Sequence, residues 1–518
     1  MQTKSALMVN ACLYTALLLA GSSAPRSYSI VSQTPQTAST QPHTAGSHRL
    51  LQTEAKLADI AARLERDVPR LMKEADVPGV SIALIRDGNV AWRHAFGVRD
   101  SATGQPALDS TVFEAASLSK PVFAYAVMKL YESGKIDLDK PLNSYLPGDY
   151  DIGPDPRLSQ ITARRVLSHT TGLPNWRPIA GQLKIFFTPG ERFSYSGEGF
   201  VYLSKVVEYI TGEKLNDFMK RTVFDPLEMT SSSYVWQTSY DDLKATRHNF
   251  LGKTTEQFKP TQANAAASLH TTAQDYGRFV AAILNGTGLK KETVAQMLAP
   301  QIQVGEGFEN TTQKAAPKLS TELSWGLGVG LQKTEDGISF WHWGDNGNTK
   351  AFVVAFPRQK LGVVVFTNSE NGLSIMPEIV EDAIGGHHPA FAWMNYESYN
   401  SPPKILLRAI VMRGAENALR DYRQMRSRPS QTEPITEAQM NRIGYQVLYG
   451  LNNPKDAILI FKLNVEDHPQ SFNTYDSLGE AYMVDGQKEL SIKNYERSLE
   501  LNPNNTNGTA RLKKLREQ

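Results

Sequence analysis

The feature that most constrains the fold is a long helical region between two groups of strand-like segments. Residues 80–85 and 90–96 are rich in apolar residues, and the Asp-Gly pair between them suits a tight hairpin. Three further strand-like runs follow much later, at about 338–342, 350–357 and 361–367. Helical patterns dominate between the two groups, for example at 199–210, 215–222 and 272–284. We therefore expect an α+β domain in which both ends of the domain complete one antiparallel sheet, with helices against it and a cleft between the layers.

The N-terminus predicts export. Lys4 precedes a mostly apolar run, and small residues near Ala24 offer a cleavage site, so we expect a signal peptide over 1–24 and a periplasmic or secreted product. Residues 25–50 are rich in Ser, Thr, Gln and Pro and predict a disordered leader. The single cysteine, Cys12, lies in the apolar run, so the mature chain would hold neither disulfides nor cysteine-bound zinc. No later segment approaches the roughly eighteen apolar residues of a membrane span.

Size and charge bound the remaining possibilities. The 518 residues exceed one ordinary domain, so a large core with an appendage is expected. The formal net charge is only +2 and charged residues make up 21% of the chain, which gives no reason to expect nucleic acid or an anionic membrane as a partner.

The character of the chain changes after about residue 400. The residues Ala457, Phe461 and Pro469 are echoed, about 34 positions later, by Ser491, Tyr495 and Pro503. This period is typical of tetratricopeptide helix pairs. We expect a first domain over 51–390, a helical linker over 391–433 and tetratricopeptide-like repeats over 434–518. Such repeats bind protein partners through a concave face, or here only cap the first domain.

A serine and a lysine lie one helical turn apart at residues 117–120, which read Ser-Leu-Ser-Lys. Residues 121–130 continue with an apolar residue at most positions, as in a helix that is buried nearly all round. Because residues i and i+3 share a helix face, the Lys120 amine can reach the Ser117 hydroxyl. A desolvated lysine can take the proton of a serine, which would make Ser117 a nucleophile. The alternative is a surface serine near a helix start with a solvated lysine.

Three motifs in order resemble those of the penicillin-recognising serine hydrolases, the group of class C β-lactamases and D-Ala-D-Ala peptidases. Residues 117–120 match the Ser-x-x-Lys motif, residues 195–197 (Tyr-Ser-Gly) match Tyr-x-Asn, and residues 342–344 (His-Trp-Gly) match Lys-Thr-Gly or His-x-Gly. The resemblance spans roughly residues 55–385. It implies a β-lactamase/transpeptidase-like fold, with an antiparallel sheet flanked by helices and a helical subdomain, and an acyl-enzyme formed on Ser117.

The resemblance also implies roles for single residues. Tyr195, with its ionised form favoured by the nearby ammonium of Lys120, would share with that lysine the task of taking the Ser117 proton, and we assign the pair jointly. The backbone N–H groups of Ser117 and Asp345 would form the oxyanion hole, and Gly344 would let the strand approach the acyl group. Alternatively, Tyr195 is a buried aromatic residue and Gly344 only a turn glycine.

Several positions depart from the family pattern. Gly197 replaces the asparagine whose amide would contact a β-lactam side chain, so lactamase activity should be weak. His342 replaces a lysine, which leaves a group near half-charge at about pH 6 to 7 where a substrate carboxylate would bind, and Trp343 adds bulk beside it. Glu198 either faces the cleft and replaces part of the lost polar contact or complements a helix dipole. We expect His169 to be a structural loop residue.

These observations predict a secreted serine hydrolase that acts on small esters or on D-amino-acid peptides or amides, with no metal and no other cofactor. A true β-lactamase or D-Ala-D-Ala carboxypeptidase is the nearest alternative. A catalytically inactive binding module that recruits a partner through the repeats is the alternative of another class.

Overall fold

The computed structural model describes residues 56–178, 181–305, 318–426 and 434–517. The predicted signal peptide and leader lie outside the described residues. The described chain divides into two compact units, the first ending at Tyr396 and the second beginning at Glu397.

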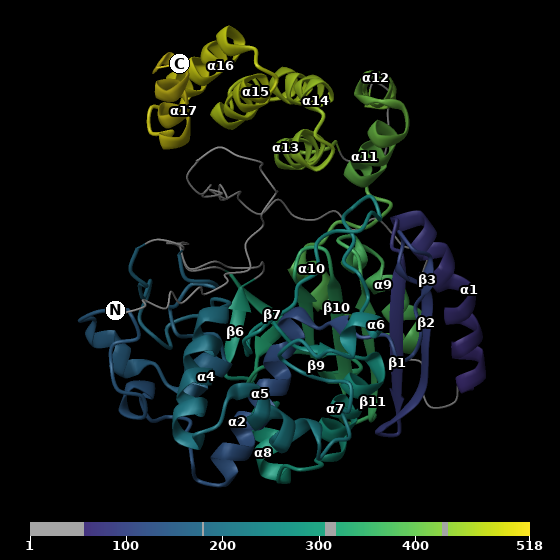
Figure 1. The fold of residues 1–518 in the computed structure, drawn as a ribbon, viewed down its shortest axis with the longest axis vertical. Helices are drawn as coiled ribbons and strands as arrows, with labels where there is room; N and C mark the ends of the chain where they lie inside the picture. The colour runs from purple at the N-terminus through teal and green to yellow at the C-terminus, as the bar shows by residue number, and fades with distance from the viewer. Residues whose placement is uncertain (1–55, 179–180, 306–317, 427–433, 518) are drawn as a thin grey trace, which may run out of the picture. The chain divides into compact units, whose positions relative to one another are not determined.

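One antiparallel sheet organises the first unit, with its strands in the order β3-β2-β1-β11-β10-β9-β8-β7-β6 (Figure 1). The strands are β1 (Gly79–Arg86), β2 (Asn89–Asp100), β3 (Gln105–Pro106), β6 (Ile302–Gly305), β7 (Leu319–Trp325), β8 (Gly330–Thr334), β9 (Gly337–Asp345), β10 (Lys350–Phe356) and β11 (Leu361–Thr367). Val80 of β1 lies opposite Thr367 of β11, so strands from both ends of the unit meet in the centre of the sheet, as predicted. Asp87 and Gly88, with φ angles of 52° and 71°, close the predicted hairpin between β1 and β2.

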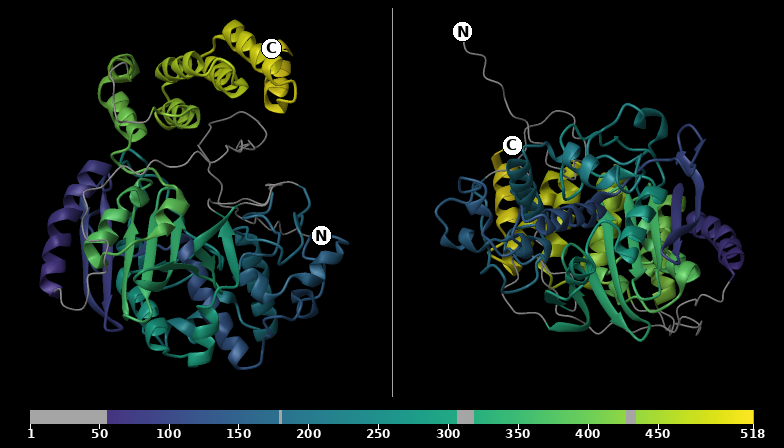
Figure 2. Two further views of the ribbon diagram at one scale, coloured as in Figure 1. Left: turned by 180° about the vertical axis from the view of Figure 1, so that it is seen from behind. Right: turned by 90° about the horizontal axis from the view of Figure 1, so that it is seen from below.

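Helices cover both faces of this sheet (Figure 2). The helices α1 (Leu57–Ala75) and α9 (Met376–Ile384) pack against each other and against β2 and β11, whereas α7 (Ala273–Asn285) packs against β1, β2 and β11. Every residue of β10 and β11 is buried, which is the pattern of strands that are covered on both sides. The predicted α+β architecture is therefore confirmed.

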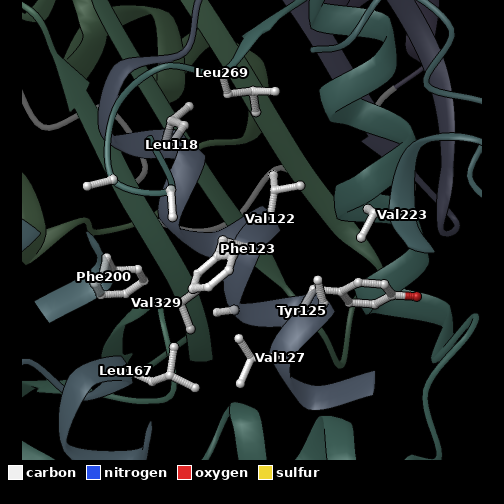
Figure 3. Close-up of a cluster of buried hydrophobic side chains, with 14 of the residues drawn as sticks. Leu118, Val122, Phe123, Tyr125, Val127, Leu167, Phe200, Val223, Leu269 and Val329 are labelled. Carbon is white, nitrogen blue, oxygen red and sulfur yellow. The ribbon is translucent and has the colours of Figure 1, made fainter. Parts of the chain in front are cut away.

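The helical region contains the helix that carries the serine and lysine motif. It comprises α2 (Ser119–Glu132), α3 (Ala163–Leu167), α4 (Gly197–Thr211), α5 (Leu215–Met219), α6 (Tyr240–Leu243) and α8 (Lys291–Met297). Side chains on several sides of α2, including Val122, Phe123 and Val127, lie among Leu167 and Phe200 from neighbouring segments (Figure 3). The helix is thus buried nearly all round, and its first turn lies in the core.

The second unit is all-α. Its helices are α11 (Pro402–Arg413), α12 (Ala415–Arg426), α13 (Glu437–Tyr445), α14 (Pro454–Asp467), α15 (Phe472–Val484), α16 (Lys488–Leu501) and α17 (Thr506–Glu517). A Cβ atom on Gly444 would lie 2.4 Å from the Phe461 ring, and one on Gly479 would lie 3.3 Å from the Tyr495 ring. This repeated glycine–aromatic contact fits the predicted period, and the tetratricopeptide assignment stays a prediction.

The start of the predicted linker lies in the first unit. Helix α10 (Pro389–Met394) precedes the division at Tyr396, and Trp393 within it packs against Trp343 of β9 at a ring centroid distance of 5.8 Å. The aromatic contact gives this segment a reason to fold with the sheet.

Candidate active site

Ser117 lies in a short 3-10 turn, Ala116–Leu118, that runs directly into α2. Lys120 Nζ lies 3.0 Å from Ser117 Oγ and donates a hydrogen bond of 2.8 Å to the Ala266 carbonyl oxygen. Lys120 is 0% exposed, and burial lowers the pKa of its amine well below the usual value. Among the described residues, no carboxylate forms an ion pair with it. A neutral amine beside a hydroxyl is able to accept the hydroxyl proton.

The backbone before Ser117 is strained and closely packed. Ala116 has a φ of 48°, a left-handed conformation that a residue with a Cβ atom rarely adopts. A Cβ atom on Gly344 would lie 2.4 Å from the Ala115 carbonyl oxygen, so β9 can pass this turn only with a glycine at that position. Gly344 therefore allows β9 to pass close to the backbone that precedes Ser117, whereas its predicted approach to an acyl group stays a prediction.

Tyr195 packs over the amine of Lys120, with 4.8 Å between its ring centroid and Nζ. Burial raises the pKa of the Tyr195 phenol, and its hydrogen bond with Ser117 offsets this only in part. The expectation that a neighbouring ammonium favours the ionised phenol is wrong, because burial disfavours charge on both groups. The structure thus brings together Ser117, Lys120 and Tyr195, with the phenol neutral.

His169 stacks on the ring of Tyr195, a contact that no sequence motif predicted. The two rings stack with centroids 4.3 Å apart, and His169 Nδ1 accepts a hydrogen bond of 3.0 Å from the Ser196 N–H. His169 is buried with a φ of 55°, and burial lowers the pKa of its imidazole strongly. It is therefore a neutral ring that fixes the orientation of the phenol.

The rings of His342 and Trp343 both pack near the ring of Tyr195. Burial, together with Lys120, lowers the pKa of His342 to about 3, and its Nδ1 lies 2.8 Å from the Trp343 carbonyl oxygen. The predicted half-charged group at pH 6 to 7 is wrong, because the ring is buried and neutral. Trp343 is also buried, and its ring lies 4.8 Å from that of Tyr195.

Asn175 and Trp176 fill the space beside Gly197. The Gly197 N–H donates a hydrogen bond of 2.9 Å to Asn175 Oδ1, and a Cβ atom on Gly197 would lie 3.1 Å from the Trp176 ring. Trp176 is 39% exposed, and its ring centroid lies 6.0 Å from Lys120 Nζ. An exposed aromatic face therefore borders the amine.

The carboxylates of Glu198 and Asp345 both have basic and hydroxyl partners. Glu198 is buried, lies 2.6 Å from the Arg177 guanidinium and accepts a hydrogen bond of 2.7 Å from the Tyr150 hydroxyl. Glu198 lies in the first turn of α4, where its charge complements the helix dipole, the second of the two predicted roles. The Asp345 side chain accepts from Lys350 Nζ at 2.5 Å and from the Tyr396 hydroxyl at 2.6 Å. These pairings neutralise the basic side chains around the site.

No group of three or more His, Cys, Asp or Glu side chains is placed to hold a metal ion within the described ranges. Of the helices that the structure describes, none combines the length and apolar character needed to cross a bilayer.

Comparison with known proteins places this geometry in context. Residues 64–379 match the family model described as Beta-lactamase. Protein flp of Staphylococcus aureus (strain COL) is 21% identical over 370 residues, which cover 67% of this chain and 69% of the relative. Esterase EstB of Burkholderia gladioli is 28% identical over 207 residues, which cover 34% of this chain and 52% of that protein.

Solved structures show the same fold. D-alanine carboxypeptidase AmpC from Burkholderia cenocepacia has a TM-score of 0.52 at 18% identity, covering 63% of this chain and 99% of its own. The octameric penicillin-binding protein homologue from Pyrococcus abyssi has a TM-score of 0.50 at 21% identity, covering 67% of this chain and 80% of its own. The predicted fold is thereby confirmed.

Proposed function

The chain belongs to the Beta-lactamase family of serine hydrolases, and from this premise we propose that it hydrolyses uncharged esters through an acyl-enzyme on Ser117. The observation that carries the proposal is the 3.0 Å separation of Ser117 Oγ from the Nζ of Lys120, a buried lysine with a lowered pKa. Burial lowers the pKa of this amine and so favours its neutral form, in which it can act as the general base.

Acylation follows from this arrangement. Ser117 Oγ attacks the ester carbonyl carbon while its proton passes to Lys120 Nζ. The resulting oxyanion is stabilised by the backbone N–H groups of Ser117 and Asp345, a pairing that the close approach at Gly344 supports. The C–O bond to the alcohol then breaks, and the alcohol leaves with the proton, for which the neutral phenol of Tyr195 provides a route. Water attacks the acyl-enzyme in the second half-reaction, which releases the acid and restores Ser117.

The charges around the site favour an uncharged substrate. A substrate carboxylate needs a cation to bind it, but Arg177 is paired with Glu198, Lys350 is paired with Asp345, and His342 is neutral. The exposed ring of Trp176 instead offers an apolar surface beside Lys120. Esters with apolar acyl groups suit these surroundings better than D-amino-acid peptides or β-lactams, which carry a carboxylate. Esterase activity is also named for one relative, EstB.

A reactive-serine experiment tests the proposal. A fluorophosphonate probe should label the full chain and Ser133→Ala, a matched serine at the far end of α2, but not Ser117→Ala. Hydrolysis of p-nitrophenyl butyrate should exceed that of nitrocefin and of a D-Ala-D-Ala peptide. Equal labelling of Ser117→Ala and the full chain would refute the nucleophile, and faster turnover of nitrocefin or the peptide would favour a β-lactamase or a carboxypeptidase instead.

Export and partner recruitment are two further parts of the proposal. The N-terminal residues 1–24 support secretion, and the repeated glycine–aromatic contacts of the second unit support tetratricopeptide-like repeats that take a protein partner. Deletion of residues 431–518 tests the second part. Unchanged ester hydrolysis with loss of co-purifying proteins would support recruitment, and loss of solubility would indicate that the repeats only cap the first unit.

A further inference from the structure

A buried ion pair that the proposed reaction does not use lies just before the nucleophile. Glu114 belongs to β4 (Phe113–Glu114), and its Oε1 lies 2.8 Å from Lys244 Nζ, with side chains exposed by 1% and 2%. The Arg247 Nε lies 3.5 Å from the same oxygen. Burial would raise the pKa of the Glu114 carboxyl, but Lys244 and Arg247 bring it down to about 2. The carboxylate is therefore charged, and it is held at a fixed place in the core.

The second oxygen of this carboxylate reaches the segment that follows β9. Asn346 Nδ2 lies 3.4 Å from Glu114 Oε2 and donates a hydrogen bond of 3.2 Å to the Ala267 carbonyl oxygen. The Arg247 guanidinium donates to the Asn346 carbonyl oxygen. Asn346 is thus held both by its side chain and by its backbone.

These contacts join the three backbone segments from which the proposed site is built, residues 114–117, 266–267 and 345–346. The first segment ends at the nucleophile, the second carries the carbonyl group that accepts from Lys120, and the third begins with the residue whose N–H completes the proposed oxyanion hole. Their spacing decides whether two N–H groups converge on one oxygen. Such donors act only within a narrow range of distance.

We propose that Asn346, anchored by Glu114, is a positioning residue that sets the spacing between the two backbone N–H groups of the oxyanion hole. The inference rests on the proposed function. A buried ion pair is weak evidence for a role in stability alone, since well-packed apolar residues of similar volume usually do as well. A fixed link between the nucleophile segment and the end of β9 is what an oxyanion hole requires.

The expected effect is a loss in kcat rather than in KM, because the oxyanion forms only in the transition state. Asn346→Ala should lower kcat for p-nitrophenyl butyrate about tenfold or more, with KM changed less than about twofold. It should weaken inhibition by phenylboronic acid, whose tetrahedral adduct with Ser117 places an oxygen in the hole, by a similar factor. Asn346→Asp keeps the size of the side chain but cannot donate while ionised, so it should not restore kcat.

A matched control separates positioning from general stability. Asn285 also joins two segments through its amide, since it donates to the Gly88 carbonyl oxygen at 2.6 Å and accepts from Lys360 Nζ at 3.1 Å. It lies near the β1–β2 turn, at the other end of the sheet from Asp345. Asn285→Ala should leave kcat and phenylboronic acid inhibition unchanged, whatever its melting temperature.

The outcomes distinguish this inference from the function on which it rests. The inference would be overturned if Asn346→Ala kept the wild-type kcat and boronate inhibition, or if Asn346→Asp had the wild-type kcat. Fluorophosphonate labelling of Ser117 would still support the proposed function in that case. Absence of labelling in the wild-type chain would overturn both. Loss of kcat in both Asn346 variants, with the wild-type chain labelled and Asn285→Ala fully active, would support both.

Discussion

Lys120 and Lys244, two of the buried lysines in the first unit, have different partners. Lys120 Nζ lies beside a hydroxyl and a carbonyl oxygen, with aromatic rings around it, and burial lowers its pKa well below the usual value. Burial also lowers the pKa of Lys244, but its Nζ lies 2.8 Å from the Glu114 carboxylate, which offsets part of that lowering. The first environment favours a neutral amine, as the proposed base requires, whereas the second holds an ion pair between two segments.

The comparison shows that burial alone does not decide what an ionisable group does. A buried amine with a carboxylate partner keeps its charge and fixes two segments relative to each other, and a buried amine without one is free to exchange a proton. The same substitution at the two positions should therefore damage different properties of the protein.

The largest effect is expected from Lys120→Met, which removes the base and keeps the volume. Ester hydrolysis should fall on the order of a thousandfold or more, because general-base assistance to Ser117 is lost. The melting temperature should stay the same or rise, since a desolvated amine is replaced by an apolar side chain. Steady-state kinetics and thermal melting measure both quantities. A large drop in melting temperature with little loss of activity would place Lys120 among the structural lysines.

Lys244→Met should mainly lower the free energy of unfolding. It leaves the Glu114 carboxylate buried without its closest cation, which costs about 3–5 kcal/mol in the free energy of unfolding. Urea denaturation followed by circular dichroism measures this cost. The double variant Glu114→Gln with Lys244→Met should recover much of the stability, because no uncompensated charge remains. Equal stability of Lys244→Met and wild type would show that the two lysines do not differ in the way described.

The pH dependence separates the two sites further. The base must be neutral, so kcat/KM should fall as pH falls through the pKa of Lys120, and this acid limb should lie well below pH 10.5. Glu114, with a folded pKa of about 2, contributes stability that is fully present above its ordinary pKa of 4.5 and is lost as pH falls through about 2. Activity should therefore decline while the ion pair is still intact. Parallel pH profiles of kcat/KM and of melting temperature test this expectation. It would be contradicted if kcat/KM and the melting temperature fell over the same pH range.

His342 adds a change in stability in a different pH range. Burial lowers the folded pKa of His342 to about 3, so between 6.5 and 3 the unfolded chain binds a proton that the folded chain does not. The free energy of unfolding should decrease as pH is lowered across this window, by up to about 1.4 kcal/mol per pH unit for one such group. His342→Phe should flatten the slope of unfolding free energy against pH. An unchanged slope would mean that the ring is already protonated in the folded protein.

Local patterns predicted much of the sheet and the central helix. The strands β1, β10 and β11 are apolar runs, the Asp-Gly pair marks the hairpin, and α2 is apolar on all sides. Strand β7, by contrast, reads Leu-Ser-Thr-Glu-Leu-Ser-Trp, lies next to the edge strand β6, and has three exposed residues among its seven. Its pairing with β6 and β8 depends on neighbours rather than on its own composition, so no local pattern indicated it.

The site was predictable where one turn of helix or one motif decides the geometry, and not where partners meet across the chain. The spacing of Ser117 and Lys120 is a property of one helical turn. The pairing of Glu198 with Arg177 and that of Glu114 with Lys244 depend on tertiary packing, which no spacing encodes. The charge state of His342 was mispredicted for the same reason, because burial and a neighbouring amine determine it.

The smallest effect tests how the environment of Lys120 is maintained. The Trp176 side chain is 39% exposed, and its ring centroid lies 6.0 Å from the buried Nζ. Trp176→Ala should hydrate the amine, raise its pKa towards the ordinary value and move the acid limb of kcat/KM to higher pH, with a loss of a few-fold at neutral pH. Trp176→Phe keeps a ring there and should shift the limb less. An unmoved limb in both variants would mean that Tyr195 and Phe200, whose rings also lie near Nζ, are enough to keep the lysine dry.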